Sequence, residues 1–199
     1  MNNISIFSVP IWEKELEIDQ NSLQDIRDFC LLLSTTQKSR VISNYGGFQS
    51  KDISNTITSK YPMNIIQNHI HKEISNLAKI IKIKPNYKFK LANVWININK
   101  KGDYNGLHDH TNSTFSGVIY IAGDFTESCI VFEHPHPIEY FFYKSIVDET
   151  SPFAIEEVAL KPKPGTMYIF PSWLRHKVPP YKKEDSRISI AFNFGSILT

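Results

Sequence analysis

The sequence is poor in cysteine, carries little net charge and has no long apolar run. Its two cysteines, Cys30 and Cys129, lie far apart and form no CxxC motif, so we expect buried, reduced thiols and a cytoplasmic protein. No apolar stretch approaches the roughly 20 residues that cross a bilayer, so we expect no membrane partner. The opening stretch, MNNISIFSVPIW, also lacks the basic start and cleavage site of a secretory signal.

The charged residues give no sign of a nucleic-acid partner. Lys and Arg number 22 against 20 Asp and Glu, which is a formal net charge of +2. The lysines are scattered, with short clusters at 79–82 and 182–183, whereas nucleic-acid binders concentrate basic residues on one face. We therefore expect these charges to form a solvated surface.

Two segments in the first half of the chain have helical periodicity. Apolar residues recur at helical spacing in 21–33 and again in 63–81. A short strand is expected at 6–12, where Pro10 fixes a bend. The helical part of the chain is therefore predicted to cover about residues 20–82.

After position 85 the pattern changes to the alternation that is typical of strands. Residues 87–99 alternate in side-chain type and are rich in β-branched and aromatic residues. Further strands, separated by glycine and proline, are expected at 113–121, 128–132, 155–160, 166–170 and 187–194. The order predicts an α+β chain with a jelly-roll (double-stranded β-helix) core at about 87–196 and the helices packed on one sheet. The length predicts a single domain, 1–199.

His108, Asp109 and His110 form an HxH motif between a glycine-containing turn and the strand expected at 113–121. Residues two apart on a strand point to the same face, so both imidazoles can reach one metal ion. His176, at a distant strand end, is the candidate third ligand, because three neighbouring corners of an octahedron leave the others open for substrates. The three histidines therefore form a candidate metal site.

The other four histidines are weaker candidates. His134 and His136 share the HxH spacing, but the prolines beside them disfavour a central strand, and we expect a loop at the mouth of the site. His69 and His71 lie on an expected helix, where residues two apart face different directions, so we expect structural roles. An HxH motif alone is a weak signal.

An arginine opens the last expected strand. On that strand Arg187 and Ser189 share one face, opposite a row of apolar residues. A buried arginine needs a counter-charge, and a planar guanidinium beside a hydroxyl suits a bidentate grip on a carboxylate. The alternative is a surface arginine at a strand end. If the arginine is considered without the other motifs, this alternative is favoured.

In this combination and order, the residues resemble the iron(II)/2-oxoglutarate-dependent oxygenases. In that family a histidine, a ligand at the next position but one and a distal histidine bind iron, and an Arg-x-Ser beyond them binds the far carboxylate of 2-oxoglutarate. The matching residues are His108, His110, His176, Arg187 and Ser189. The chain is similar in particular to a poorly characterised bacterial and phage branch of these oxygenases, through the stretches 6–12, 43–50, 95–110, 116–121, 161–181 and 187–194.

The sequence departs from the wider family at position 110, where the second ligand is usually Asp or Glu. Three neutral imidazoles leave iron with one more positive charge than the usual triad, which favours the dianionic co-substrate and alters dioxygen activation. Two alternatives stay open. Asp109 is the ligand if the strand carries a β-bulge, or the protein has kept the metal and lost oxygenase activity.

The resemblance implies that iron(II), 2-oxoglutarate and dioxygen together hydroxylate a substrate and release succinate and carbon dioxide. Arg187 and Ser189 would anchor the far carboxylate of 2-oxoglutarate, and Asn97 and Tyr120 are candidates for hydrogen bonds to its C1 carboxylate. Trp173 is expected in the core or the pocket wall. No catalytic side chain is assigned beyond the metal ligands, because the iron carries the hard chemistry.

The sequence does not name the substrate, whether small or macromolecular. The expected rim is formed by loops at 44–50, 133–145 and 148–153, and the aromatic run 140–143 is compatible with a core, a homodimer contact or substrate stacking. Two rival functions stay open: a cupin-type three-histidine dioxygenase without 2-oxoglutarate, and a non-catalytic β-sandwich binding module. The first leaves Arg187 without a role.

Overall fold

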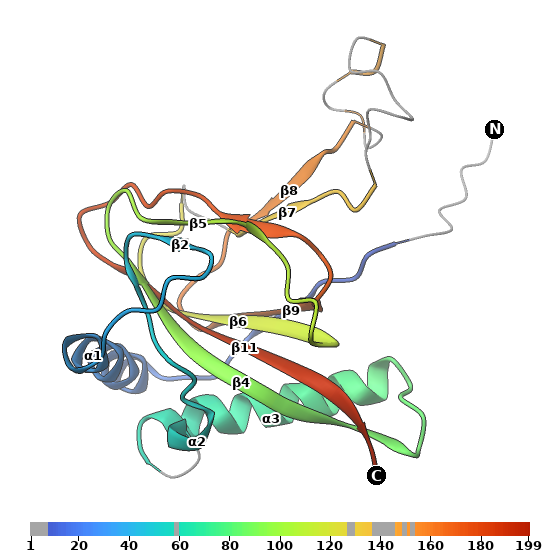
Figure 1. The fold of residues 1–199 in the computed structure, drawn as a ribbon, viewed down its shortest axis with the longest axis horizontal. Coiled ribbons are helices and arrows are strands. Elements are labelled where there is room, and N and C mark those ends of the chain that lie inside the picture. Colours follow the sequence, from blue (N-terminus) through green and yellow to red (C-terminus); the bar gives the residue numbers. More distant parts are fainter. Residues whose placement is uncertain (1–7, 58–59, 127–129, 137–145, 149–150, 152–153) are drawn as a thin grey trace.

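The protein consists of two antiparallel β-sheets that face each other, with helices against the outside of the larger sheet (Figure 1). The computed structural model describes residues 8–57, 60–126, 130–136, 146–148, 151 and 154–199. In chain order the elements are β1 (Trp12–Glu15), α1 (Gln20–Thr36), β2 (Asn44–Tyr45), β3 (Phe48–Gln49), α2 (Ser54–Ile57), α3 (Met63–Ile80), β4 (Tyr87–Asn99), β5 (Tyr104–His108), β6 (Phe115–Ala122), β7 (Ile130–Glu133), β8 (Glu157–Leu160), β9 (Thr166–Pro171), β10 (His176–Val178) and β11 (Arg187–Leu198).

The strand order is that of a jelly roll, in which neighbours in space are distant in the sequence. The six-stranded sheet runs β1-β9-β6-β11-β4-β3 and the five-stranded sheet β2-β5-β10-β7-β8. The longest pair of the six-stranded sheet is β4 with β11, which runs from Arg187 opposite Asn99 to Leu198 opposite Tyr87 with one register shift between Asn193 and Phe194. This confirms the predicted α+β fold with a double-stranded β-helix core.

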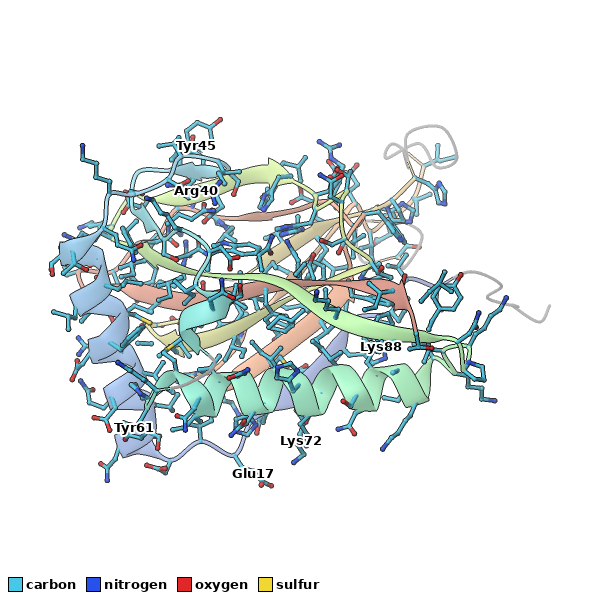
Figure 2. The ribbon with its side chains drawn as sticks, turned by 60° about the horizontal axis from the view of Figure 1, so that its bottom comes forward. Glu17, Arg40, Tyr45, Tyr61, Lys72 and Lys88 are labelled. Atoms are coloured by element: carbon cyan, nitrogen blue, oxygen red, sulfur yellow. The ribbon has the colours of Figure 1, made fainter. Side chains whose placement is uncertain are left out.

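Helix α3 packs along the six-stranded sheet through a single apolar face (Figure 2). The spacing of its buried residues, three or four positions apart, is that of one helix face: Met63, Ile66, Ile70, Ile74 and Leu77. They share one core with Ile26 and Cys30 of α1 and with the outer face of the sheet. Burial of each such aliphatic side chain contributes roughly 1.5–3 kcal/mol to the free energy of folding. The contact between α3 and the six-stranded sheet therefore stabilises the sheet on which Arg187 lies.

The two faces of β11 meet different environments, as the alternation predicts. Its apolar residues point toward the helices and are fully buried: Ile188, Ile190, Phe192 and Phe194. The residues between them line the space enclosed by the two sheets: Arg187, Ser189, Ala191 and Asn193. An apolar cluster that includes Tyr168, Phe170 and Phe132 fills part of that space, and the rest is an open cavity.

A glycine on β6 permits the closest packing in the large sheet. A Cβ at Gly117 would lie 2.2 Å from Cζ of Phe192, the residue opposite it on β11. Because Phe192 is fully buried, its ring has no free space to move into. Position 117 therefore excludes any side chain.

A tight turn between β2 and β3 joins the two sheets at one edge of the sandwich. β2 pairs with β5 in the small sheet, and β3 pairs with β4 in the large one. The turn between them has Gly46 at φ +70° and Gly47 at φ +65°, and a Cβ on Gly47 would lie 2.6 Å from the carbonyl oxygen of Ile98. Glycine avoids both the positive-φ strain and the clash, so the connection stays tight.

The predicted helices and strands after residue 20 are all present, with bounds shifted by a few residues. The strand predicted at 6–12 is wrong for its described part: residues 8–11 are not a strand, and β1 begins at Trp12, where pairing with Ile169 of β9 starts. Strands β5 and β10 were not predicted. Cys30 is a free, buried thiol as expected, and Cys129 lies outside the described residues.

No helix in the ranges given above is both long and apolar enough to cross a membrane.

Candidate metal centre and cavity

The three histidines singled out in the sequence converge at one point between the sheets. His108 ends β5 and His176 begins β10, and the two are directly opposite in the small sheet. His110 completes the group: one ring nitrogen from each residue lies within 4.8 Å of those of the other two. The three ring centroids are 4.4–5.2 Å apart. This is the geometry of a set of ligands that can hold one metal ion.

Two of these rings are fixed by hydrogen bonds to backbone carbonyls. Nδ1 of His108 donates to the carbonyl oxygen of Gly106 at 2.7 Å, and Nδ1 of His176 donates to that of Leu174 at 2.9 Å. A carbonyl only accepts, so each Nδ1 carries the proton and each Nε2 keeps its lone pair. Such bonds orient metal-binding histidines, because they fix both the tautomer and the ring plane.

His110 is held in a different way. It lies two residues beyond the end of β5, so the expectation that the HxH motif lies on a strand is wrong for this residue. Its backbone N–H donates to the carbonyl oxygen of Ser172 at 2.8 Å, and its ring stacks on Trp95 with centroids 5.6 Å apart. A contact with the turn after β9 therefore places His110, and Asp109 stays outside the cluster.

Burial keeps these imidazoles neutral. Desolvation, followed by the nearby His108, lowers the pKa of His176 from 6.5 to about 3 and that of His110 to about 4. Desolvation also lowers the pKa of His108. A neutral imidazole is the form that binds a metal, so protons do not compete for these nitrogens near neutral pH.

A cavity of about 260 Å³ extends from the histidines between the two sheets. Its size is close to the lower end of ligand pockets, which span roughly 300–1,000 Å³. Every predicted cofactor-binding residue lines it: Asn97, Tyr120, Arg187 and Ser189. The structure therefore brings the candidate ligands and the candidate co-substrate residues into one space.

Arg187 is buried within this cavity rather than at the surface. It is 2% exposed, and its Nη1 donates to the carbonyl oxygen of Pro179 at 3.2 Å. Its guanidinium carbon lies 5.3 Å from the ring centroid of Tyr181, which supports the cation from one face. The alternative of a surface arginine at a strand end is thereby excluded.

The floor of the cavity contains a row of polar residues in register across three strand pairs. Gln49 of β3 lies opposite Asn97 of β4, Asn97 opposite Ser189 of β11, and Ser189 opposite Tyr120 of β6. All four line the cavity. A long polar co-substrate can thus lie across the sheet and meet hydrogen-bonding groups from several strands.

The sequence reasoning missed several polar residues of the cavity wall. These are Arg40, Asn93, Asn99 and Asn105, whereas Gln49 belongs to the segment 44–50 that was expected at the rim and does line the cavity. One signal was present for those on β4: Asn93, Asn97 and Asn99 lie four and two positions apart, and the residues between them are apolar or aromatic. Polar residues on the inner face of a buried strand indicate a ligand cavity on that side.

Other predictions around the site have mixed outcomes. Trp173 was expected in the core or pocket wall, but it is 52% exposed, because the next residue, Leu174, takes the buried place in the turn. His134 and His136 are exposed and do not line the cavity. The aromatic run 140–143 lies outside the described residues.

A comparison with family models identifies the chain. The model described as "Putative 2OG-Fe(II) oxygenase" matches residues 93–193, which is just over half of the 199 residues and contains the three histidines and Arg187. The chain therefore belongs to the 2OG-Fe(II) oxygenases, enzymes that use iron(II) and 2-oxoglutarate. This assignment favours the oxygenase over the cupin-type and non-catalytic alternatives.

Solved structures share the fold at low sequence identity. The non-heme α-ketoglutarate-dependent epimerase SnoN from nogalamycin biosynthesis has a TM-score of 0.65 and 10% identity, over 96% of this chain and 80% of its own. A Pseudomonas putida prolyl-4-hydroxylase has a TM-score of 0.62 and 12% sequence identity, and the match covers 94% of this chain and 93% of the hydroxylase. The viral collagen prolyl hydroxylase of Paramecium Bursaria Chlorella virus-1 has a TM-score of 0.58 and 14% sequence identity, and the match covers 92% of this chain and 94% of the viral enzyme. No curated protein matches the sequence.

Proposed function

We propose that this oxygenase hydroxylates its substrate with iron(II) held by His108, His110 and His176 and with 2-oxoglutarate held by Arg187 and Ser189. The observation that carries the proposal is the meeting of three neutral imidazoles and one buried guanidinium in a single cavity. Fold likeness alone would not define the chemistry, because one fold hosts many functions.

The residues present fit an iron(II) ion. Imidazole nitrogen suits iron among other first-row metals, and three ligands on one side leave positions for co-substrate and dioxygen. Two of the rings already have the tautomer that binding needs, and the low pKa values of His110 and His176 keep them unprotonated. The tautomers and the neutral charge of these rings therefore suit metal binding as they stand.

The residues also fit a dicarboxylate co-substrate. The guanidinium of Arg187 offers paired N–H donors, and Ser189 lies on the same face of β11, two residues further. Asn97 is opposite Ser189 on β4, and Tyr120 is opposite it on β6, so both can bind the carboxylate nearer the metal. We assign the far carboxylate to Arg187 and Ser189.

When bound, iron(II) supplies the activation of dioxygen that converts 2-oxoglutarate to succinate and carbon dioxide and oxidises the substrate. The chain supplies position and environment. The two sheets exclude bulk water from the cavity, and a low local dielectric strengthens the Arg187–carboxylate contact. Asn97, Ser189 and Tyr120 of the polar row hold the co-substrate in one orientation, so that substrate meets it from the open side.

Anaerobic titration with iron(II) and 2-oxoglutarate tests the assignment, read by the weak visible charge-transfer band of the chelate. The parent protein should develop the band, and His108→Ala should lose it. Arg187→Ala should need about ten- to hundredfold more 2-oxoglutarate, the range for a lost hydrogen bond to a charged group. His71→Ala, on α3, is the matched control and should titrate like the parent. Normal titration of His108→Ala would mean that the site is misassigned.

Further parts of this proposal concern the whole protein. We propose that residues 1–199 act as one oxygenase domain, with hydroxylation in the cytoplasm inferred from a sequence with only two cysteines and no CxxC motif. A homodimer is compatible with the sequence. Light scattering of the purified protein measures the number of subunits directly.

A further inference from the structure

We propose that the primary substrate is a small carboxylic acid carrying an N–H or O–H donor, and that Arg40 binds its carboxylate at the mouth of the cavity. This inference rests on the proposed function. It concerns the part of the cavity that metal and co-substrate leave unused. No residue of this part belongs to the triad or to the polar contacts assigned to 2-oxoglutarate.

Arg40 is the second guanidinium of the cavity. It lies on the segment between α1 and β2, at the same end of the molecule as Tyr45 (Figure 2), and its side chain is exposed. Within the described part of the chain its guanidinium forms no ion pair or hydrogen bond. A cation that faces a cavity without a protein partner is available for an anion from solution.

The backbone of Arg40 is held in place although its side chain is not. Its N–H donates to the carbonyl oxygen of Gln49 at 2.8 Å, and its carbonyl oxygen accepts from Nδ2 of Asn44 at 3.0 Å. Arg40 is thereby fixed beside β3 and beside the residue that begins the polar row. A fixed backbone reduces the entropy lost when the side chain binds a ligand.

Gln49 supplies the second group of the proposed subsite. It is 5% exposed, it lines the cavity, and its Oε1 is buried without a hydrogen-bond partner among the residues that the structure describes. Oδ1 of Asn93, which also lines the cavity, is buried and unpartnered as well. Buried acceptors are normally paired, so these two call for a donor on the ligand.

The acidic residues near the mouth form no ion pair with Arg40 within the described part of the chain. The carboxylate of Asp52 already accepts N–H bonds from Val94 and Ser54. Asp109 is exposed and forms no ion pair with Arg40. The cation and the two acceptors thus describe a ligand with one carboxylate and at least one N–H or O–H donor.

The size of the cavity favours a small ligand. About 260 Å³ has to accommodate 2-oxoglutarate as well as the reacting part of the substrate. Arg40 lies at its exposed side, so a short acid can place its carboxylate at the mouth and its carbon chain toward the metal. An α-amino acid or α-hydroxy acid has this arrangement of groups.

Calorimetric titration under argon tests the inference on protein loaded with iron(II) and saturated with 2-oxoglutarate. The probes are L-α-amino acids, their N-acetyl derivatives and α-hydroxy acids, each paired with its own methyl ester. At least one acid should bind ten or more times more tightly than its ester. Arg40→Gln should remove this preference, Arg40→Lys should retain part of it, and the control Lys38→Gln, which does not line the cavity, should match the parent.

The possible outcomes separate this inference from the proposed function. If the parent fails to bind 2-oxoglutarate, the proposed function is wrong and the substrate inference falls with it. If 2-oxoglutarate binds but no acid exceeds its ester, the substrate class is wrong and the proposed function stands. A preference that survives in Arg40→Gln would also overturn the role of Arg40. A weaker affinity of Arg40→Gln for 2-oxoglutarate itself would assign Arg40 to the co-substrate instead.

Discussion

The ring of His110 stacks on the indole of Trp95, with centroids 5.6 Å apart and planes inclined by 30°. The other two histidines of the cluster are fixed by hydrogen bonds from Nδ1 to backbone carbonyls. No ring nitrogen of His110 has such a bond within the described ranges. The ring of His110 is instead held between aromatic rings: Trp95, and His176 at 5.2 Å with planes inclined by 7°.

Replacing Trp95 should weaken metal binding without removing a ligand. A stacked aromatic pair contributes about 0.5–1.5 kcal/mol beyond its buried area, so Trp95→Leu should raise the dissociation constant for cobalt(II) about three- to tenfold. Trp95→Phe should keep most of the affinity, because it retains an aromatic face. Equilibrium dialysis measures the constant, and the visible cobalt spectrum reports the ligand geometry. The exposed Trp173→Leu is the control, and equal loss in both leucine variants would contradict the positioning role.

The metal-free protein should lose stability in acid because of its buried histidines. The folded-state pKa is about 3 for His176 and about 4 for His110, against 6.5 for the ordinary side chain. Above pH 6.5 both states are neutral and the histidines add no pH dependence. Below it the unfolded chain binds protons that the folded chain does not, so the free energy of unfolding falls by about 1.4 kcal/mol per pH unit for each histidine.

Urea unfolding of the metal-free protein between pH 7.5 and 4.5 measures this slope. Protonation of the folded state ends each contribution below its pKa, so the loss should run from about pH 6.5 to about 4 for His110 and to about 3 for His176. His176→Gln should show a shallower slope than the parent, because it removes one of these groups. An unchanged slope in that variant would mean that His176 is protonated in the folded state.

A methyl group at position 117 should destabilise the fold. A Cβ there would lie 2.2 Å from Cζ and 2.7 Å from Cε2 of the buried Phe192, so Gly117→Ala has to displace a packed ring. Overpacking of this kind costs about 1–3 kcal/mol in the free energy of unfolding. Gly195→Ala is a matched control on β11, since a Cβ at Gly195 meets no atom within 4 Å. Equal stability of both variants in denaturant would contradict the close approach.

Features that depend on local periodicity were predictable from the sequence. The alternation of β11 predicted that Arg187 and Ser189 share a face, and the structure places both in the cavity. The helical spacing in 63–81 predicted α3 almost to its end at Ile80. In these segments the apolar pattern and the local propensity agree, which is the condition under which such predictions succeed.

Features that depend on distant contacts were not predictable. The place of His110 is set by a hydrogen bond to Ser172, which lies on the turn after β9. Strand β10 has three residues, too few for an alternating pattern to be recognised. Gln49 reaches the cavity only because β3 pairs with β4, and a two-residue strand has no periodicity of its own. Tertiary pairing decides all three cases.

The turn between β2 and β3 connects the two sheets, and the residues around it have a different proposed role from the later part of the chain. Arg40 and Gln49 lie on its two flanks, whereas the three histidines are contributed by later segments. One contiguous stretch of this oxygenase thus faces the incoming molecule without supplying any of the metal-binding imidazoles. On the proposed role of Arg40, substitutions within residues 40–49 would change substrate preference and leave the three metal-binding histidines in place, provided that Gly46 and Gly47 are kept.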